Sequence, residues 1–440
     1  MLRFKKCLGL MAAVMSASLF IAPLSHAATN TQSIAIPAYE YPTLTALWGA
    51  IDTAGSQVPF VIVNPASGPG TSANSDYTNR IATNTTEGIR SIGYVDTNYQ
   101  TRPIADVMND IDLWYSLYPG IQGIFFDRVS VVDSAALCYS AYAYNYAKVK
   151  HTNDPVIQNF GTYTSPAYEP YGDILVNAEM DHVLYQTWVL PADGFQNNPA
   201  YSNRFWHLVH TTNSTDLAST LTQTRNNNAG WVYITDDTMP NPYDTAPTYW
   251  NTELTSVATL PASTIPNRGV TNLPAGCLDV SAQTNSSQTN NTTTVTASLA
   301  NNSTTYGVPT PTVVSFTLPN GVTLESASGT GWACNNTTCT HNGNVAAGAA
   351  TADLTATFSA TCSYQSGDIT TTTTSFPQTT STSSASIARP SSCPTADTPT
   401  NSTTPTSVEL ASTGVNMITI LAAGATLVTL GTAIATRRKL

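Results

Sequence analysis

The chain has 440 residues, a formal net charge of -11 and a sequence pI near 4.8, and only 10% of its residues are charged. A surface that binds nucleic acid needs clustered Lys and Arg, so this balance argues against nucleic acid as a partner. The length allows two domains with additional terminal segments.

The N-terminus has the pattern of an export signal. Basic residues within the first six positions precede an apolar stretch from Leu8 to Ile21, and Ser25-His26-Ala27 supplies small residues for cleavage. This order is typical of a secretory signal peptide, whose apolar part is too short to span a bilayer. We therefore expect signal peptidase to remove residues 1–27 and the protein to be secreted.

Residues 28–262 alternate short β-type runs with helical stretches. The runs are mostly apolar throughout, as expected of strands that are buried on both faces of a parallel sheet. Eight such runs over this length predict an α/β fold, a (β/α)8 TIM-like barrel, with a doubly wound sheet as the alternative. The runs are Ser33–Ala38, Pro59–Asn64, Ser91–Asp96, Gly120–Asp127, Pro155–Phe160, Asp173–Glu179, Phe205–His210 and Gly230–Asp236.

Acidic residues stand at the ends of four of these runs. Asp96, Asp127, Glu179 and Asp236 each end or directly follow an apolar stretch. Because a barrel builds its site from the C-terminal ends of its strands, we expect these carboxylates around one mouth. Burial of acids near each other separates their pKa values, so that one can donate a proton while another stays ionised. Two such carboxylates are the basic equipment of a glycosidase.

Aromatic residues are frequent around the same positions, and their faces are suited to stacking against sugar rings. We expect Asp96 to orient the substrate. Asp236 and five aromatic residues are expected to contact it: Tyr39, Tyr94, Trp188, Trp206 and Tyr233. No Cys or His spacing has the form of a zinc site, and nothing in the sequence requires a metal or an organic cofactor.

The predicted barrel contains five segments that share one resemblance: Ile36-Pro37-Ala38-Tyr39, Val63-Asn64-Pro65-Ala66-Ser67-Gly68-Pro69-Gly70, Gly93-Tyr94-Val95-Asp96-Thr97, the run from Gly120 to Asp127, and Asn159-Phe160-Gly161. Together they resemble the spherulin-4 family, over essentially the whole barrel. The resemblance implies a (β/α)8 fold and hydrolase activity, since that family includes fungal glycoside hydrolases that act on galactosaminogalactan. It matches Asp127 to the first of two acids at the end of the fourth strand, and Glu179 to a Glu near a later strand end. Arg128 stands in the place of the second acid.

Each of these candidates also has a structural interpretation. Asp127 could cap the helix that follows it, Glu179 could be a surface acid at the start of a loop, and Asp96 could hold loop backbone through Asx-type bonds. His207 and His210 lie on one predicted strand. We interpret both as core residues rather than catalysts.

Residues 271–390 have a different composition, rich in Thr, Val, Asn and Ala. Segments that alternate apolar and polar residues predict a small immunoglobulin-like β-sandwich. The stretch from Gly329 to Gly348, with a Trp beside a Cys pair, resembles repeat domains of bacterial surface proteins. Cys334 and Cys339 are predicted to form a hairpin disulfide, and Cys138, on a predicted helix, is expected to be a buried free thiol. The remaining connectivity stays open.

Beyond about Gly367 the chain is mostly Thr, Ser and Pro, and it lacks the apolar residues needed to offset the entropy of ordering. We therefore predict a solvated Ser/Thr/Pro-rich stalk, which we place at residues 391–409. The part of this stretch before Cys393 is expected to be fixed to the sandwich by a disulfide.

Residues 410–440 combine the pentapeptide Leu410-Ala411-Ser412-Thr413-Gly414, an apolar run over 417–435 and the basic end Arg437-Arg438-Lys439. This order resembles a sortase cell-wall sorting signal, in the variant with Ala at the second position. The run is about long enough to cross a bilayer, and the basic end should stay in the cytoplasm. The resemblance implies that sortase cleaves after Thr413 and transfers the chain to a peptidoglycan precursor. A simple membrane anchor is the alternative.

These patterns predict a secreted protein that is anchored to the cell wall, or to the outer face of the membrane, of a Gram-positive-type bacterium. Its barrel is expected to hydrolyse a polysaccharide, one that contains amino sugars, with Asp127 and Glu179 as the catalytic carboxylates. The alternatives are a non-catalytic glycan-binding adhesin, which Arg128 favours, and a structural wall protein.

Overall fold

The computed structural model describes residues 29–191, 194–309, 311–377 and 379–394. Its first region is built on one nine-stranded sheet in which all paired neighbours are parallel. In sheet order the strands are β1 (Ser33–Ile34), β9 (Trp231–Ile234), β8 (Phe205–His210), β7 (Ile174–Asp181), β6 (Val156–Asn159), β5 (Ile124–Asp127), β4 (Arg90–Asp96), β3 (Phe60–Val63) and β2 (Ile36–Pro37).

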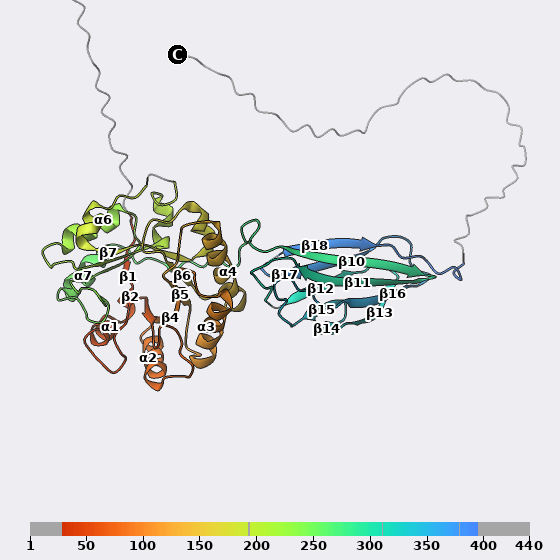
Figure 1. The fold of residues 1–440 in the computed structure, drawn as a ribbon, viewed down its shortest axis with the longest axis horizontal. Helices are drawn as coiled ribbons and strands as arrows, with labels where there is room; N and C mark the ends of the chain where they lie inside the picture. Colours follow the sequence, from red (N-terminus) through yellow and green to blue (C-terminus); the bar gives the residue numbers. More distant parts are fainter. Residues whose placement is uncertain (1–28, 192–193, 310, 378, 395–440) are drawn as a thin grey trace, which may run out of the picture. The chain divides into compact units, whose positions relative to one another are not determined.

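The two ends of this sheet are neighbours in the sequence. β1 and β2 are separated by Ala35 alone, yet β1 pairs with β9 and β2 pairs with β3. The sheet therefore curves round until its ends meet and forms a nearly closed barrel, which we call the barrel from here on (Figure 1). A doubly wound sheet would keep two separate edges, so that alternative is excluded. Each of the eight predicted runs contains strand, and β3 is buried at all four positions, as its apolar sequence predicts.

Helices lie around the outside of the sheet (Figure 1). They are α1 (Trp48–Ala54), α2 (Ser75–Thr86), α3 (Ile104–Leu117), α4 (Ser134–Lys150), α5 (His182–Thr187), α6 (Leu217–Asn226) and α7 (Trp250–Val257), with short 3-10 turns η1 (Gly55–Gln57), η2 (Pro166–Tyr171) and η3 (Pro199–Arg204). The alternation departs from strict β-α order after β6, where only η2 follows. Pro170 lies inside this turn and cannot donate a backbone hydrogen bond, which disfavours a longer α-helix.

A second region consists of two antiparallel sheets, which we call the two-sheet region (residues 280–385). One sheet contains β10 (Val280–Thr289), β11 (Thr292–Asn301), β16 (Leu354–Ala360) and β13 (Val322–Ser328); the other contains β14 (Trp332–Asn335), β15 (Thr338–His341), β12 (Thr312–Thr317), β17 (Ile369–Ser375) and β18 (Thr379–Ala385). Buried positions alternate along β11, as the sequence pattern predicts. One hydrophobic cluster contains residues of both sheets, and Phe316 contacts Phe358 across it at 5.1 Å between ring centroids.

The Thr-rich stretch after Gly367 is partly strand rather than stalk. β17 and β18 pair along its first part, and Ile369 and Ala385 at their ends belong to the shared cluster. A few apolar residues at strand ends are therefore enough here, because the neighbouring strand β12 supplies the pairing partner. The predicted stalk at 391–409 lies outside the described residues except for its first four positions.

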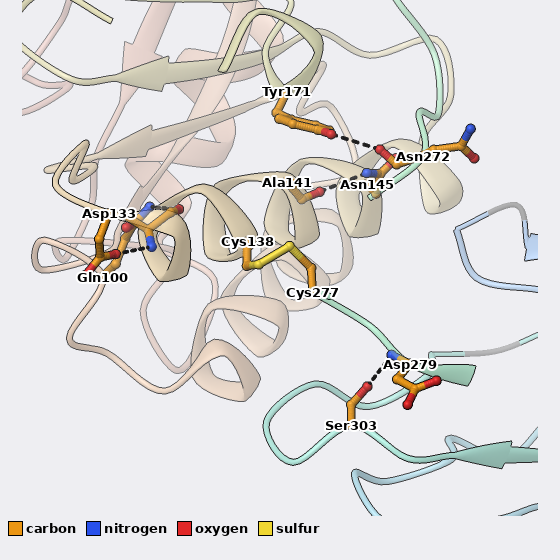
Figure 2. Close-up of a disulfide and its surroundings, with 11 residues drawn as sticks. Gln100, Asp133, Cys138, Ala141, Asn145, Tyr171, Asn272, Cys277, Asp279 and Ser303 are labelled. Carbon is orange, nitrogen blue, oxygen red and sulfur yellow. Dashed lines mark hydrogen bonds between the residues drawn. A yellow bond between two sulfur atoms is a disulfide. The ribbon is translucent and has the colours of Figure 1, made fainter. Parts of the chain in front are cut away.

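The six cysteines of the described chain form three disulfides. Cys334–Cys339 is present as predicted. Cys362–Cys393 joins the segment after β18 to the loop after β16, which is the expected disulfide to the sandwich with a partner that the sequence had left open. The expected free thiol at Cys138 is wrong, because Cys138 on α4 is bonded to Cys277 (Figure 2). The two cysteines are 139 positions apart in sequence, so no local pattern could have paired them.

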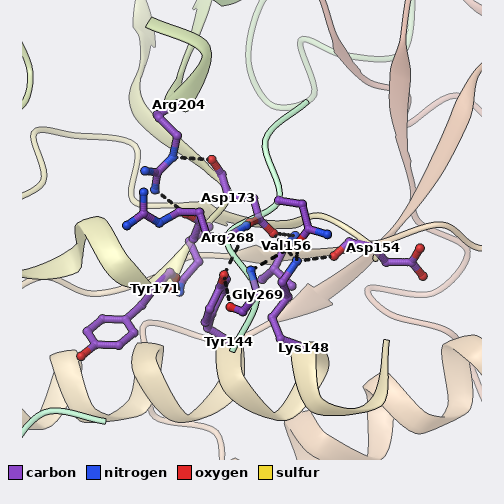
Figure 3. Close-up of polar contacts among 12 residues, drawn as sticks. Tyr144, Lys148, Asp154, Val156, Tyr171, Asp173, Arg204, Arg268 and Gly269 are labelled. Carbon is purple, nitrogen blue, oxygen red and sulfur yellow. Dashed lines mark hydrogen bonds and ion pairs between the residues drawn. The ribbon is translucent and has the colours of Figure 1, made fainter. Parts of the chain in front are cut away.

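The segment that connects the barrel to the two-sheet region is held by a buried ion pair. The Lys148 and Asp173 side chains are fully buried, with Nζ and Oδ2 2.8 Å apart (Figure 3). Asp173 also accepts hydrogen bonds from the backbone N–H groups of Val156 and Arg268, and Lys148 donates to the side chain of Asn267. Buried charges need such complete pairing, so this network serves the fold.

In the part of the chain that the structure describes, no helix is long and apolar enough to cross a membrane. The predicted signal peptide (1–27), the sorting signal (410–440) and the membrane span within it (417–435) lie outside the described residues.

Candidate active site

A cavity of about 730 Å³ opens at the C-terminal ends of the barrel strands. Its lining comes from the ends of β5, β6, β7 and β8, from the residues after β2 and β4, and from the loop after β9. Both predicted catalytic residues line it, Asp127 at the end of β5 and Glu179 near the end of β7. The parallel sheet explains this convergence, because it directs all strand ends toward the same mouth.

Asp127 is held by neutral hydrogen-bond donors. The Tyr94 hydroxyl donates to its Oδ2 at 2.7 Å, and the Asn159 amide donates to its Oδ1 at 2.7 Å. The alternative role of Asp127 as a helix cap is not observed, because the side chain that caps α4 is Asp133. Asp127 is therefore positioned for the cavity.

Asn159 connects the two acids. Its Nδ2 donates both to Asp127 Oδ1 at 2.7 Å and to Glu179 Oε2 at 2.6 Å. The two oxygens can be no further apart than the sum of these two distances. Carboxyl groups about 5–5.5 Å apart are typical of retaining glycosidases, and about 6.5–9.5 Å of inverting ones. The facing oxygens Asp127 Oδ1 and Glu179 Oε2 therefore lie closer together than the inverting range.

A backbone hydrogen bond from Gly161 fixes the orientation of the Asn159 amide. Its Oδ1 accepts a hydrogen bond from Gly161 N at 2.9 Å, so its Nδ2 must face the carboxylates. Gly161 has a φ of 62°, a left-handed conformation that suits glycine, and its carbonyl accepts from Glu179 N at 3.0 Å. The Asn159-Phe160-Gly161 segment thus holds both the amide and the backbone of Glu179.

Tyrosines complete the polar shell. Tyr243, in the loop after β9, donates its hydroxyl to Glu179 Oε1 at 2.8 Å. Tyr39 lies between Tyr94 and Tyr243, with edge-on ring contacts of 5.9 Å to each. Burial, together with the nearby acids, raises the pKa of Tyr39 well above its ordinary value, so its phenol stays protonated.

The electrostatics of the pair favour a shared proton. Burial raises the pKa of Asp127, and the hydrogen bonds from Tyr94, Arg128 N and Asn159 oppose this effect only in part. Burial, and then the charge of Asp127, raise the pKa of Glu179. Across the described residues, no Lys, Arg or His forms an ion pair with either carboxylate. Two adjacent acids without a cation do not both ionise readily.

Arg128 is paired with a different acid. Its guanidinium binds both carboxylate oxygens of Asp96, with Nε 2.8 Å from Oδ1. Asp96 Oδ1 also accepts from Asn98 N at 2.7 Å, which is the Asx-type bond proposed as its structural interpretation. Asp96 is not among the residues that line the cavity, whereas Arg128 lines its rim. The pair therefore leaves no free positive charge at the carboxylates.

Besides Asp96, four of the predicted substrate-binding residues lie away from the cavity. Trp206 and Tyr233 are fully buried, Trp206 against Phe60 inside the barrel. Trp188 stacks on Tyr185 of α5, and Asp236 is bonded to the backbone and hydroxyl of Thr248. Of the predicted aromatic set, Tyr39 lines the cavity, and Tyr94 contacts the lining residues Asp127 and Tyr39.

The two histidines occupy different environments. His207 is buried, its Nδ1 lies 2.7 Å from the Tyr185 hydroxyl, and burial lowers its pKa to about 3. This agrees with its interpretation as a core residue. His210 instead lines the cavity. Within the described ranges, no three His, Cys, Asp or Glu side chains gather closely enough to hold a metal ion.

Sequence reasoning missed the roles of Asn159 and Tyr243. Asn159 lies one residue before the end of a predicted strand, within a segment that carried the family resemblance, so its position was a usable signal. Tyr243 lies in a loop of irregular sequence between β9 and α7. No periodicity directs a loop tyrosine toward a particular strand end, and only the folded loop brings it to Glu179.

Comparisons with known proteins match the barrel. The family model of spherulation-specific family 4 matches residues 33–257. Spherulin-4 of Physarum polycephalum is 31% identical over 253 residues, which cover 54% of this chain and 75% of that protein. Among solved structures, Aspergillus clavatus Sph3 in complex with GalNAc is 24% identical, with a TM-score of 0.44 over 52% of this chain and 98% of that one. A glycosyl hydrolase family 2 member from Bacteroides cellulosilyticus is 7% identical, with a TM-score of 0.34 over 82% of this chain and 61% of that one.

Proposed function

The chain belongs to spherulation-specific family 4, and we propose that its barrel, of the (β/α)8 class, is a glycoside hydrolase that cleaves a polysaccharide containing amino sugars. The observation that carries this proposal is the bridge from Asn159 to Asp127 and Glu179, which holds two carboxylates close together at the mouth without a cation. That arrangement is suited to proton donation by one acid and charge stabilisation by the other.

The hydrogen bonds suggest how the roles divide. Asp127 accepts from Tyr94, Asn159 and the backbone of Arg128, whereas Glu179 accepts from Asn159 and Tyr243 only. Donors aimed at a carboxylate stabilise its charged form, so the richer set favours the negative charge on Asp127 over Glu179. In this proposal Glu179 holds the proton and donates it to the leaving oxygen, and Asp127 faces the developing positive charge at the anomeric carbon.

The charge of the cavity supports a cationic or neutral sugar as substrate. Asp127, Glu179 and Asp181 line it, and the nearby guanidinium of Arg128 is neutralised by Asp96. Complementary potentials favour a glycan that carries amino groups and disfavour an acidic one. This agrees with the substrate class implied by the family resemblance.

The direct test is the release of reducing ends by residues 28–409 from a panel of galactosaminogalactan, chitosan, neutral glucan and an acidic glycan. We expect release from an amino-sugar polymer, and loss of release in Asp127→Asn and in Glu179→Gln. Asp236→Asn is the matched control, because Asp236 follows β9 of the same barrel but lies outside the cavity. Release that survives in both catalytic variants would refute the proposal.

The second candidate function is a glycan-binding adhesin without catalysis. Arg128, at the position where the resembling hydrolases carry a second acid, favours it, because one proton-transfer group fewer is present. An adhesin would bind a glycan of the panel and release no reducing ends from any of them. Turnover by the wild-type protein excludes it.

We also propose export and anchoring to the cell wall of a Gram-positive-type bacterium, with the two-sheet region as an immunoglobulin-like spacer. The support is the order of Leu410–Gly414, the apolar run and the basic end. Thr413→Ala should shift the protein from the muramidase-released wall fraction to the membrane or the medium. An unchanged wall fraction would contradict sortase anchoring.

A further inference from the structure

A second cavity, of about 370 Å³, lies beside the cavity that holds the carboxylates. Its lining comes from the loops after β4 and β5, from the first turns of α3 and α4, and from Thr305 and Tyr306 of the two-sheet region. Tyr99 lines both cavities. The two spaces are therefore neighbours with one shared aromatic wall.

The loop that carries Tyr99 presents its ring to solvent. Tyr99 is 63% exposed. Asn98, Tyr99 and Gln100 have φ values of 48°, 55° and 63°, three successive left-handed conformations that side chains rarely adopt. Tyr99 N donates to Arg128 O at 2.7 Å, and the Arg128 guanidinium lies 5.6 Å from the ring centroid. Strain of this kind persists where the surrounding structure holds the loop in place.

The walls of the second cavity have the chemistry of a carbohydrate site. Tyr139 and Tyr306 supply aromatic surface, and Gln100, Ser130 and Asp133 supply polar groups at the edges. Apolar ring faces with a few polar groups around them suit sugar rings, whose faces are apolar and whose rims carry hydroxyls.

The two-sheet region is held against this site by covalent and aromatic contacts. The Cys138–Cys277 disulfide joins α4 to the segment that precedes β10 (Figure 2). Tyr142, one turn further along α4, stacks on Tyr306 at 4.9 Å between ring centroids and donates its hydroxyl to Gly307 O at 2.7 Å. These contacts fix Tyr306 as a wall of the cavity, so the barrel alone would leave the cavity incomplete.

We propose that the second cavity is a subsite for further sugar units of the same polysaccharide, with Tyr99 as the platform between the two cavities. The two-sheet region is then part of the substrate-binding surface and not only a spacer. This inference rests on the proposed function, because it takes the ligand class from the carboxylate cavity. It adds the prediction that affinity grows with the length of the glycan.

The test fills the second cavity without altering the carboxylates. Ala135 is exposed at the second position of α4 and lines this cavity, so Ala135→Trp would occupy it. Ala218 is exposed at the second position of α6 and lines neither cavity, so Ala218→Trp is the matched control. Tyr99→Ala is a second variant, and because the Tyr99 side chain is largely exposed we expect the variant to fold.

The readout is kcat/KM on galactosaminogalactan oligosaccharides of graded length, measured with the full mature chain. Ala135→Trp and Tyr99→Ala should lower the ratio of kcat/KM for long over short oligosaccharides about 10-fold, mainly through KM, and Ala218→Trp should not change it. An unchanged ratio in Ala135→Trp would overturn the subsite.

The same variants separate this inference from the proposed function. If the wild-type chain turns over no glycan, the hydrolase proposal fails, and the subsite is tested by binding in affinity electrophoresis with the same oligosaccharides. Binding that strengthens with length and is lost in Ala135→Trp supports the subsite without catalysis. Length-independent binding, or no binding by the wild-type chain, overturns it.

Discussion

Two carboxylates at opposite ends of β7 are stabilised in opposite ways. Asp173 lies just before β7 and is fully buried, and it is matched by the Lys148 ammonium and by backbone N–H groups (Figure 3). Glu179 lies near the other end of β7 and accepts only from the neutral side chains of Asn159 and Tyr243. The N-terminal end of the strand therefore has a compensated charge, and the C-terminal end does not.

The presence or absence of a cationic partner distinguishes an acid that stabilises the fold from one that can take part in a reaction. A buried acid with a cationic partner is costly to disturb but is not available to a substrate. A partly buried acid beside a second acid, without a cation, has a raised pKa and is suited to proton transfer to a substrate. Barrels generally keep structural interactions at the N-terminal face and reactive groups at the C-terminal face, and both ends of β7 follow this division.

The largest effect is expected when the compensated end loses its cation. Lys148→Met should leave Asp173 buried and unpaired and lower the free energy of unfolding by about 3–5 kcal/mol. Lys150→Met is the matched control on the same helix, because the pair of Lys150 with Asp112 is solvent-exposed and should contribute only about 0–1 kcal/mol. Chemical denaturation of both variants measures the difference. Equal losses of unfolding free energy would contradict a larger contribution of the buried Lys148–Asp173 pair.

At the uncompensated end we expect a loss of activity without a loss of stability. Asp127→Asn keeps the size of the side chain but removes the charge, so turnover should fall at least ~100-fold while glycan binding survives. The melting temperature should stay constant or rise, because the charged form of a carboxyl with a raised pKa destabilises the fold. A marked drop in melting temperature would instead assign Asp127 a structural role like that of Asp173.

A smaller effect is expected in the pH dependence of stability. Folding raises the pKa of Asp127 and Glu179, so the folded chain binds their protons more tightly than the unfolded chain does. Stability from this source is present below the ordinary pKa of about 4 and is lost as the pH rises through the raised values. Relative to Asp127→Asn/Glu179→Gln, the wild-type chain should therefore lose unfolding free energy as the pH rises from 4 to 8. A constant difference would contradict the raised values.

The sequence predicted the barrel-like sheet and two cavity acids because these features are local. A strand that is buried on both faces is a short apolar run, and an acid that follows it marks the mouth, as Asp127 and Glu179 do. The same runs do not tell which residues point into the barrel and which toward the helices. Trp206 and Tyr233 were therefore expected at the mouth but lie in the core.

Contacts between segments far apart in the chain could not be predicted from the sequence. Tyr243 reaches Glu179 across 64 positions, and Cys138 pairs with Cys277 across 139. No local sequence pattern predicts either contact, because each depends on where a loop or a linker packs against the barrel. The second cavity at Tyr99 also depends on a contact between distant segments, the stacking of Tyr306 on Tyr142.

The central claim, that Asp127 and Glu179 act as one coupled acidic pair, can be tested without a substrate. We suggest a titration followed by NMR of side-chain carboxyl 13C signals, assigned with Asp127→Asn and Glu179→Gln. We predict that one carboxyl of the pair has a pKa well above the ordinary value of about 4. Removal of either charge should lower the pKa of the other carboxyl. Two carboxyls that ionise independently near pH 4 would contradict it.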